Sequence, residues 1–227
     1  CREGILEYVK EGCPKPRVAL DLLQGKLDQE NKYPWQSVNY LESHDDYAFI
    51  DRLCKASEWK DGKPPAGIEE KGRFALGLVL FSPGIPMLSA GQDFLRGKQG
   101  VRNTYLRGDL NALEYSAESK FGEFQQWIRG LIRFRLSKEG RFLRPESLED
   151  FTYEEILIKK GGAFGLCIRD EKNSASWLIL VNPTFSYLDV VQPAFPNLAQ
   201  ATLLFGKKTE KPRRIAPMDI QAWKLSG

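Results

Sequence analysis

The spacing of apolar residues changes near Pro145, and this change constrains the fold more than any other feature. Before it, apolar residues recur every three or four positions, which is typical of amphipathic helices. After it, short stretches alternate apolar and polar residues and are separated by Gly, Pro and Asn, which is typical of antiparallel strands. The sequence therefore predicts an α/β part over residues 1–146 and a β part over residues 147–227.

Helices and strands alternate in the first part. In chain order, the expected elements are a helix over 2–11, a strand over 37–43, a helix over 71–81, a strand over 85–91 and a helix over 124–140. Gly12 ends the first helix, and Pro14 and Pro16 block its continuation. A polar loop of about thirty residues follows the second strand, and this unusual length suggests function or mobility. The order predicts a fraction of an α/β fold.

The second part contains short period-two runs. The expected strands lie at 154–160, 163–170, 176–183, 187–193, 201–206 and 219–225. Turn residues between these runs favour antiparallel connections, so this part is predicted to be a small β-sandwich behind the α/β part.

Charge and hydropathy exclude several classes of partner. The 33 Lys and Arg residues nearly balance the 30 Asp and Glu residues, so neither nucleic acid nor an anionic membrane surface is expected as the main partner. The longest apolar runs fall far short of the roughly 20 residues that cross a bilayer. The chain begins with Cys1 and shows no signal peptide. We therefore expect it to start inside a longer protein, of undetermined compartment, with the cytoplasm favoured over secretion.

The four cysteines form no CxxC pair, and the chain has one histidine, so a zinc site is not expected. Free and mostly buried thiols are the first interpretation. A disulfide between Cys1 and Cys13 is the alternative.

The one histidine, His44, lies among acids just after the strand expected at 37–43. In α/β barrels the active site lies at the carboxyl ends of the strands, where the loops converge. A structural hydrogen bond is the alternative role for a lone imidazole beside acids. Asp46 and Asp51 have a further alternative role, because either could cap a helix that begins near Tyr47.

These residues match a known pattern. The stretch "VNYLESHDDY" at 38–47 resembles a conserved segment of the α-amylase superfamily of glycoside hydrolases, in the form found in type I pullulanases and glycogen-debranching enzymes. The stretch "RFALGLVLFSPGIPMLSAGQDFLRGKQGVRNTYLRGDLNALEY" at 73–115 and the helix "QQWIRGLIRFR" at 125–135 follow in the same order as in that group. The resemblance covers about residues 3–140, and the β part resembles the C-terminal sandwich of the group.

The resemblance implies the C-terminal part of a (β/α)8 barrel, about strands 7 and 8, followed by an antiparallel β-sandwich. It also implies a retaining mechanism, in which an acid and a nucleophilic carboxylate flank the glycosidic bond. Asp45 matches the carboxylate that stabilises the transition state, and His44 matches a hydrogen-bond donor to the same sugar. Glu42 in the same motif is expected to support these groups from behind.

The resemblance further implies substrate-binding positions on the two loops. These are Asp46, Tyr47, Arg96, Lys98, Asn103, Tyr105, Asp109 and Asn111. For each of them a loop-scaffolding role is the alternative. Two positions depart from the group: Asp46 replaces the usual Asn, which adds a negative charge beside Asp45, and Asp93 replaces the commoner Glu.

The segments that carry the nucleophile and the acid/base are not found upstream of residue 37. Three interpretations follow: the C-terminal part of a cleaved or partly sequenced enzyme, half of a two-chain enzyme, or a non-catalytic α-glucan-binding or structural module. In the first two, the whole enzyme hydrolyses α-1,6 linkages, and the 227-residue chain alone is inactive. The expected partners are an α-glucan and the remaining N-terminal part of the enzyme. No cofactor or metal is expected, and this segment does not support calcium.

Overall fold

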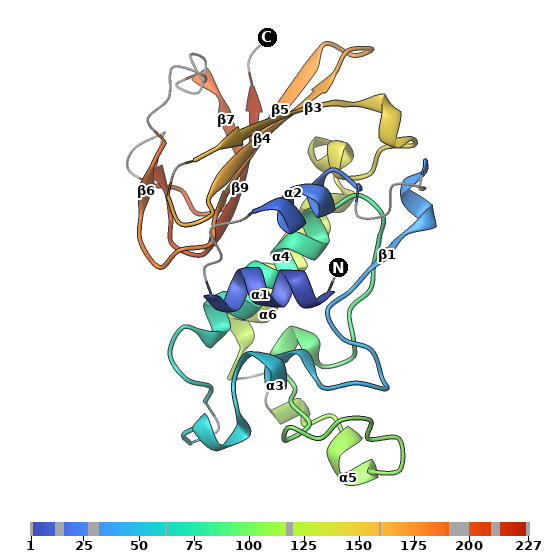
Figure 1. Ribbon diagram of the computed structural model, residues 1–227, viewed down its shortest axis with the longest axis vertical. Coiled ribbons are helices and arrows are strands. Elements are labelled where there is room, and N and C mark those ends of the chain that lie inside the picture. The colour runs from blue at the N-terminus through green and yellow to red at the C-terminus, as the bar shows by residue number, and fades with distance from the viewer. Residues whose placement is uncertain are drawn as a thin grey trace.

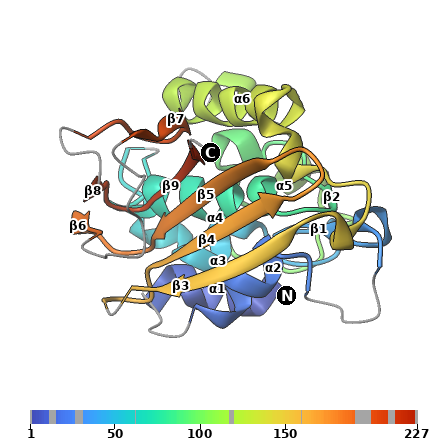
Figure 2. The same ribbon diagram turned by 90° about the horizontal axis from the view of Figure 1, so that it is seen from above.

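The computed structural model describes residues 2–11, 16–26, 32–61, 63–116, 120–158, 160–190, 200–209 and 214–225. Helices and a pair of parallel strands form one part, and an antiparallel sheet lies across the helices (Figure 1). Seen from above, strands β3, β4 and β5 cross the helical layer (Figure 2). The fold therefore mixes helices with an antiparallel sheet, as the sequence predicts.

Helix α4 occupies the middle of the helical layer and contacts α1, α2, α3 and α6. The helices are α1 (Arg2–Glu11), α2 (Arg17–Leu23), α3 (Phe49–Leu53), α4 (Ile68–Phe81), α5 (Gly108–Asn111) and α6 (Gly122–Leu136). Short 3-10 turns lie at Pro34–Gln36, Ala56–Glu58, Gln92–Phe94, Glu139–Leu143 and Leu148–Asp150. The three predicted helices are confirmed, although α6 ends at Leu136 and not at residue 140. Because α4 is covered on several sides, most of its residues are buried.

Helix α2 was not predicted, because Pro16 was interpreted as a stop signal. Pro16 is instead the residue that precedes the helix, where a missing backbone N–H costs no hydrogen bond. The buried residues Ala19, Leu20, Leu22 and Leu23 then hold α2 against the core.

The two predicted parallel strands are present but short. Strand β1 (Val38–Asn39) pairs in parallel with β2 (Ile85–Pro86), with Val38 opposite Ile85. The expected lengths, 37–43 and 85–91, were wrong, since hydrogen bonding ends after the amide of Met87 donates to the carbonyl of Asn39. The Asn39 side chain donates to Ser82 Oγ at 3.0 Å, which fixes the pair to the end of α4.

A sheet of five antiparallel strands, in the order β3-β4-β5-β9-β7, forms most of the second part. The strands are β3 (Thr152–Leu157), β4 (Phe164–Asp170), β5 (Ala175–Asn182), β7 (Thr202–Phe205) and β9 (Asp219–Leu225). Strands β6 (Leu188–Asp189) and β8 (Arg214–Ile215) form a separate pair. The antiparallel strands are confirmed, β8 was not predicted, and residues 191–193 of the fourth expected strand lie outside the described residues. The sandwich stays a prediction.

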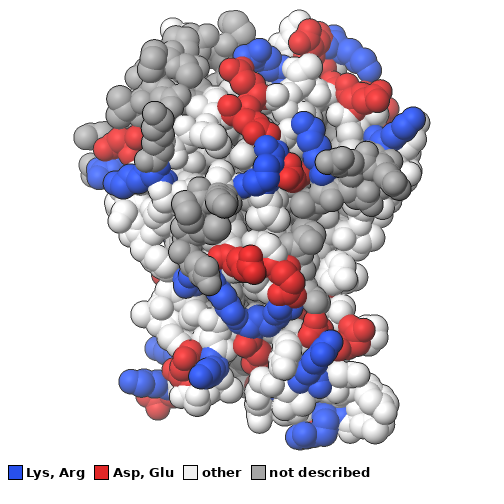
Figure 3. All heavy atoms as spheres, viewed as in Figure 1, with Lys and Arg blue, Asp and Glu red and all other residues white. Residues whose placement is uncertain are grey.

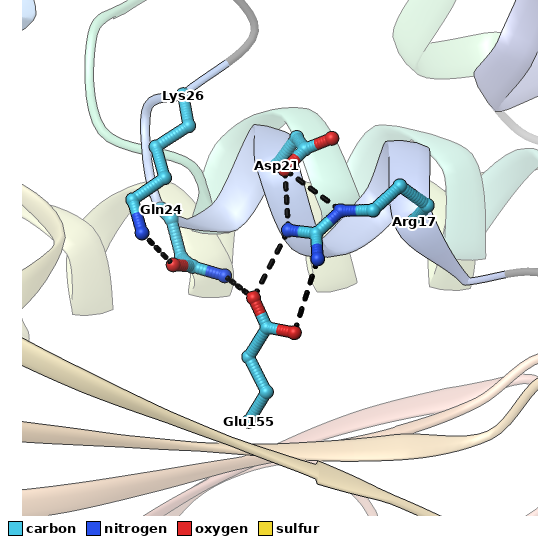
Figure 4. A network of polar contacts seen from close by, with 5 residues as sticks. All are labelled: Arg17, Asp21, Gln24, Lys26 and Glu155. Atoms are coloured by element: carbon cyan, nitrogen blue, oxygen red, sulfur yellow. Dashed lines mark hydrogen bonds and ion pairs between the residues drawn. The ribbon is translucent and has the colours of Figure 1, made fainter.

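Both parts share one hydrophobic core, and a polar network also joins them. Buried residues from Ile5 in α1 to Ala222 in β9 belong to a single cluster. On its surface, Arg17 of α2 donates two hydrogen bonds to Glu155 of β3, at 3.0 and 3.1 Å (Figure 4). Gln24 donates to the same carboxylate at 2.6 Å. The helices and the sheet therefore pack as one body, and a division at residues 146 and 147 stays a prediction.

Two cysteines can be compared with the sequence expectations. Cys54 and Cys167 are free and buried, as predicted, and burial raises the pKa of the Cys167 thiol to about 11. Cys1 and Cys13 lie outside the described residues. None of the helices in the described segments is long and apolar enough to cross a membrane.

Candidate functional site

The turn that follows β1, residues 43–47, carries the predicted catalytic residues at the carboxyl end of the strand. His44 and Asp45 are exposed, while Asp46 is half-buried. Ser43 Oγ donates to Asp45 Oδ1 at 2.7 Å, which orients this carboxylate within the turn. We call this segment the His44 turn. It carries an exposed histidine and an exposed aspartate at consecutive positions.

Glu42 lies directly behind the His44 turn and is 1% exposed. Its Oε2 atom accepts a hydrogen bond from the amide of Phe49, the first residue of α3, and its Oε1 atom lies 3.4 Å from Arg96 Nη2. Glu42 therefore both caps the start of α3 and pairs with a partly buried guanidinium. The supporting position expected for Glu42 agrees with these contacts.

The alternative capping role of two acids was wrong. The residue before α3 is Ala48, which has no side-chain cap. Asp46 Oδ1 accepts from the adjacent amide of Tyr47 at 2.8 Å, and Asp51 Oδ2 accepts from the amide of Lys98 at 2.6 Å. Both carboxylates thus bind amides outside the start of α3, where Glu42 accepts from the amide of Phe49.

Lys98 is 2% exposed, which the sequence did not predict. Its Nζ atom donates to the carbonyls of His44 and Asp46, at 3.2 and 3.3 Å. Its ammonium group therefore faces the backbone of the His44 turn from the inside.

Two arginines approach the half-buried carboxylate of Asp46. Arg52 Nη1 lies 3.9 Å from Oδ2, and Arg102 Nε lies 3.5 Å from Oδ1. Sequence reasoning missed both arginines. The departure from Asn to Asp at this position thus adds a charge that neighbouring cations compensate.

The long loop contributes the remaining candidates. Asn103 is exposed in the left-handed region, with φ of 51°, and the Tyr105 side chain is 75% exposed. Asn111 donates to the carbonyl of Thr104 at 2.5 Å and accepts from its hydroxyl at 2.6 Å. Asn111 thus closes the loop, which leaves Tyr105 at its exposed tip.

Asp109 is exposed beside Arg107, which donates to it at 2.9 and 2.7 Å. These hydrogen bonds hold the pKa of the Asp109 carboxyl below its usual value. Asp109 and Arg96 line one cavity of about 310 Å³. The cavity is also lined by Trp59, Phe94, Leu110, Glu114, Lys120 and Phe121.

The candidates therefore fall into two groups. Arg96 pairs with Glu42 behind the His44 turn, and Lys98 donates to the carbonyls of His44 and Asp46 within it. Tyr47 is exposed at the end of the turn, while Asn103 and Tyr105 precede α5, and Asp109 and Asn111 belong to it (Figure 1). Across the face displayed in Figure 3, acidic and basic side chains are interspersed.

Within the described segments, no three His, Cys, Asp or Glu side chains are grouped so that they could hold a metal ion. The exposed imidazole and carboxylate can instead exchange hydrogen bonds with hydroxyl groups of a ligand.

Known proteins resemble this chain in sequence and in fold. No family model matches. A pullulanase from Bacillus subtilis is 32% identical over 170 residues, which are 72% of this chain and 22% of that protein. A glycogen debranching enzyme from Dickeya chrysanthemi is 27% identical over 202 residues, which are 74% of this chain and 30% of that enzyme. The chain thus spans less than a third of the length of these relatives.

A solved structure agrees with the sequence relatives. The crystal structure of a pullulanase from Anoxybacillus sp. LM18-11, complexed with maltotetraose, superposes with a TM-score of 0.76 at 18% identity. The match covers 99% of this chain and 34% of that one, so the same mixed fold recurs within the pullulanase. These findings confirm the predicted resemblance to pullulanases and debranching enzymes.

Proposed function

We propose that this chain, which resembles pullulanases and debranching enzymes in sequence, is part of a retaining glycoside hydrolase that cleaves α-1,6-glucosidic linkages. Its substrates are pullulan, glycogen or limit dextrins. The observation that carries the proposal is the His44 turn, which presents His44 and Asp45 at the carboxyl end of a parallel strand. The short parallel pair and the sheet then correspond to part of a (β/α)8 barrel and a β-sandwich.

Asp45 stabilises the transition state in this proposal. The reacting sugar develops positive charge as its bond to the leaving group breaks, and a carboxylate held close to its hydroxyls stabilises that state more than the ground state. The exposed carboxylate of Asp45 is oriented by Ser43, which leaves it accessible to a sugar. His44 hydrogen-bonds the same sugar through its exposed ring.

Outer residues bind further glucose units. Tyr105, at 75% exposure, offers its ring for stacking, and Tyr47 is a second exposed ring beside the turn. Asn103, Asp109 and Arg96 offer polar contacts. Lys98 and Asn111 act through the loops, because their side chains already bind backbone carbonyls.

The remaining N-terminal part of the enzyme is the proposed protein partner. Val38 and Ile85 lie opposite each other in the parallel pair and are 51% and 47% exposed. Parallel sheets are normally covered on both faces, so we expect the N-terminal part to pack against these apolar side chains. A mostly apolar groove of about 440 Å³ adjoins the pair. It is lined by Pro34, Trp35, Leu80, Ile85, Pro86, Leu88, Ile132 and Leu136. In this proposal the N-terminal part supplies the nucleophile and the acid/base.

The alternative function is a non-catalytic α-glucan-binding or structural module. The continuous core shared by the helices and the sheet favours it, because such a core is what an independent module needs. The two functions differ in one respect: the enzyme needs two further carboxylates from another segment, and the module needs none.

The test is Asp45→Asn in the full-length protein, assayed on pullulan, with exposed Asp189→Asn as the control. We expect turnover to fall by about a hundredfold or more, because a transition-state contact is lost. Circular dichroism should show an unchanged fold. Near-normal turnover in Asp45→Asn contradicts the stabilising role. Binding of maltotetraose without any turnover in the unaltered full-length protein supports the module.

A further inference from the structure

Residues 96–102, in the long loop between β2 and α5, contact the His44 turn and Glu42 behind it. Arg96 pairs with Glu42 behind the turn, and the Lys98 ammonium binds inside it. Arg102 reaches Asp46 on the outer side. We call residues 96–102 the clamp segment. Its two arginines each pair with a carboxylate, whereas Lys98 binds backbone carbonyls.

Lys98 makes the innermost of these contacts. A buried ammonium is unfavourable unless hydrogen bonds replace its hydration, and here the carbonyls of His44 and Asp46 do so. These two carbonyls belong to the residues on either side of Asp45. Because both carbonyls are drawn toward the same cation, they point into the protein, and Lys98 fixes the backbone on both sides of Asp45.

The backbone of the clamp segment also lies unusually close to α3. A Cβ atom at Gly97 would lie 2.9 Å from Asp51 Oδ1 and 3.3 Å from Ile50 Cγ2. Only glycine allows this approach without displacing the neighbours, and it lets the amide of Lys98 donate to Asp51 at 2.6 Å. Lys98 is therefore anchored at both its backbone and its side chain.

We propose that Lys98 is a positioning residue for the His44 turn, and not a sugar ligand. Its ammonium holds the turn from the inside, so that the Asp45 carboxylate and the His44 ring face the substrate. The consequence for catalysis rests on the proposed function, but the structural role does not. A displacement of catalytic groups by about 1 Å can lower turnover about a hundredfold.

The experiment measures the turn directly and needs no substrate. Histidine-selective isotope labelling of the full chain gives an NMR signal for the His44 ring, assigned by its loss in His44→Gln. In Lys98→Met we expect this signal to shift or to split, and amide hydrogen exchange over residues 43–47 to accelerate about tenfold or more. Lys98→Arg, which keeps a cationic donor, should restore most of the signal.

The control is Lys224→Met, since Lys224 is exposed and lies on β9 of the antiparallel sheet, away from this turn. It should leave the His44 signal unchanged. Unaltered His44 signals and exchange rates in Lys98→Met overturn the proposal. If Lys98→Met fails to fold, Lys98→Gln is compared with Lys98→Arg, and identical His44 signals in these two overturn it. These measurements do not depend on glucan hydrolysis. An error in the proposed function can therefore be distinguished from an error in the positioning role of Lys98.

Discussion

The carboxylate of Glu42 accepts a hydrogen bond from the amide of Phe49, so an acid that precedes the His44 turn starts the helix that follows it. The same carboxylate neutralises Arg96. The turn is therefore closed at its base by one buried side chain, which links β1, α3 and the loop after β2.

Replacement of Glu42 should therefore cost stability according to what the new side chain can accept. Glu42→Gln keeps an acceptor for the Phe49 amide, whereas Glu42→Ala leaves both that amide and Arg96 without it. We expect Glu42→Ala to lower the free energy of unfolding by about 3 kcal/mol, and Glu42→Gln by clearly less. Urea unfolding measures both. Equal losses in the two variants would contradict the capping role.

Asp219 should make stability depend on pH. It is 3% exposed, and burial raises the pKa of its carboxyl to about 6, although the amide of Lys207 donates to it at 3.0 Å. The folded state therefore holds this proton more tightly than the unfolded chain. The free energy of unfolding should fall as the pH rises from about 4 to about 6, by at most about 3 kcal/mol.

Asp219→Asn removes this titration, so its stability should change less over that pH range than that of the unaltered protein. The measurement is urea unfolding at several pH values between about 4 and 8, with exposed Asp189→Asn as the control. Parallel stability curves for the unaltered protein and Asp219→Asn would rule out the role of Asp219.

Arg135 of α6 should stabilise the end of α4. Its guanidinium is 5% exposed and donates to the carbonyls of Leu80 and Ser82, each at 2.7 Å, and of Gly84 at 2.9 Å. Burial lowers its pKa to about 10, so it stays charged at neutral pH. It thus satisfies carbonyls that the helix end leaves free.

Arg135→Met should lower the free energy of unfolding by about 3 kcal/mol, because the carbonyls become buried without donors. Arg133→Met on the exposed side of α6 is the matched control and should change stability by less than about 0.5 kcal/mol. Thermal unfolding compares the two. Similar effects at both positions would refute the specific role.

Arg17 and Glu155 should couple α2 to β3 only weakly. Their side chains are partly exposed to solvent, so water and salt screen the pair despite its two hydrogen bonds. A double-mutant cycle with Arg17→Ala and Glu155→Ala should give a coupling of about 0.5 to 1 kcal/mol, which decreases at high salt. A coupling that does not change with salt would argue against an exposed ion pair.

The sequence predicts those elements in which the spacing of apolar residues reflects the face that is buried. Helices α4 and α6 and strands β4, β5 and β9 were found because their apolar spacing follows the core on one or both sides. Helix α2 was missed because the same proline can end one helix or precede another. The strands β1 and β2 were predicted too long, because apolar residues continue past the last ladder hydrogen bond.

The His44 turn was located by its sequence, but its support was not. Glu42 contacts Arg96, which lies 54 positions further along the sequence, and no local sequence pattern predicts such a contact. Lys98 was expected to bind substrate, with a loop-scaffolding role as the alternative. Because lysine is almost never fully buried, its inward position could be seen only in the fold.

Strand β5 lies between two hydrophobic clusters that consist of different residues. Ile179 and Val181 pack toward the helices, while Leu178 and Leu180 belong to a second cluster with Val190 and with Ile215 of β8. A change of one apolar side chain in β5 therefore disturbs the cluster on its own face of the strand and spares the cluster on the other face. Adding or deleting one residue within β5 would exchange the contents of both clusters at once, because successive side chains point to opposite faces. Natural variation should thus change the size of these side chains far more readily than the number of residues in the strand, which sets the face to which each side chain points.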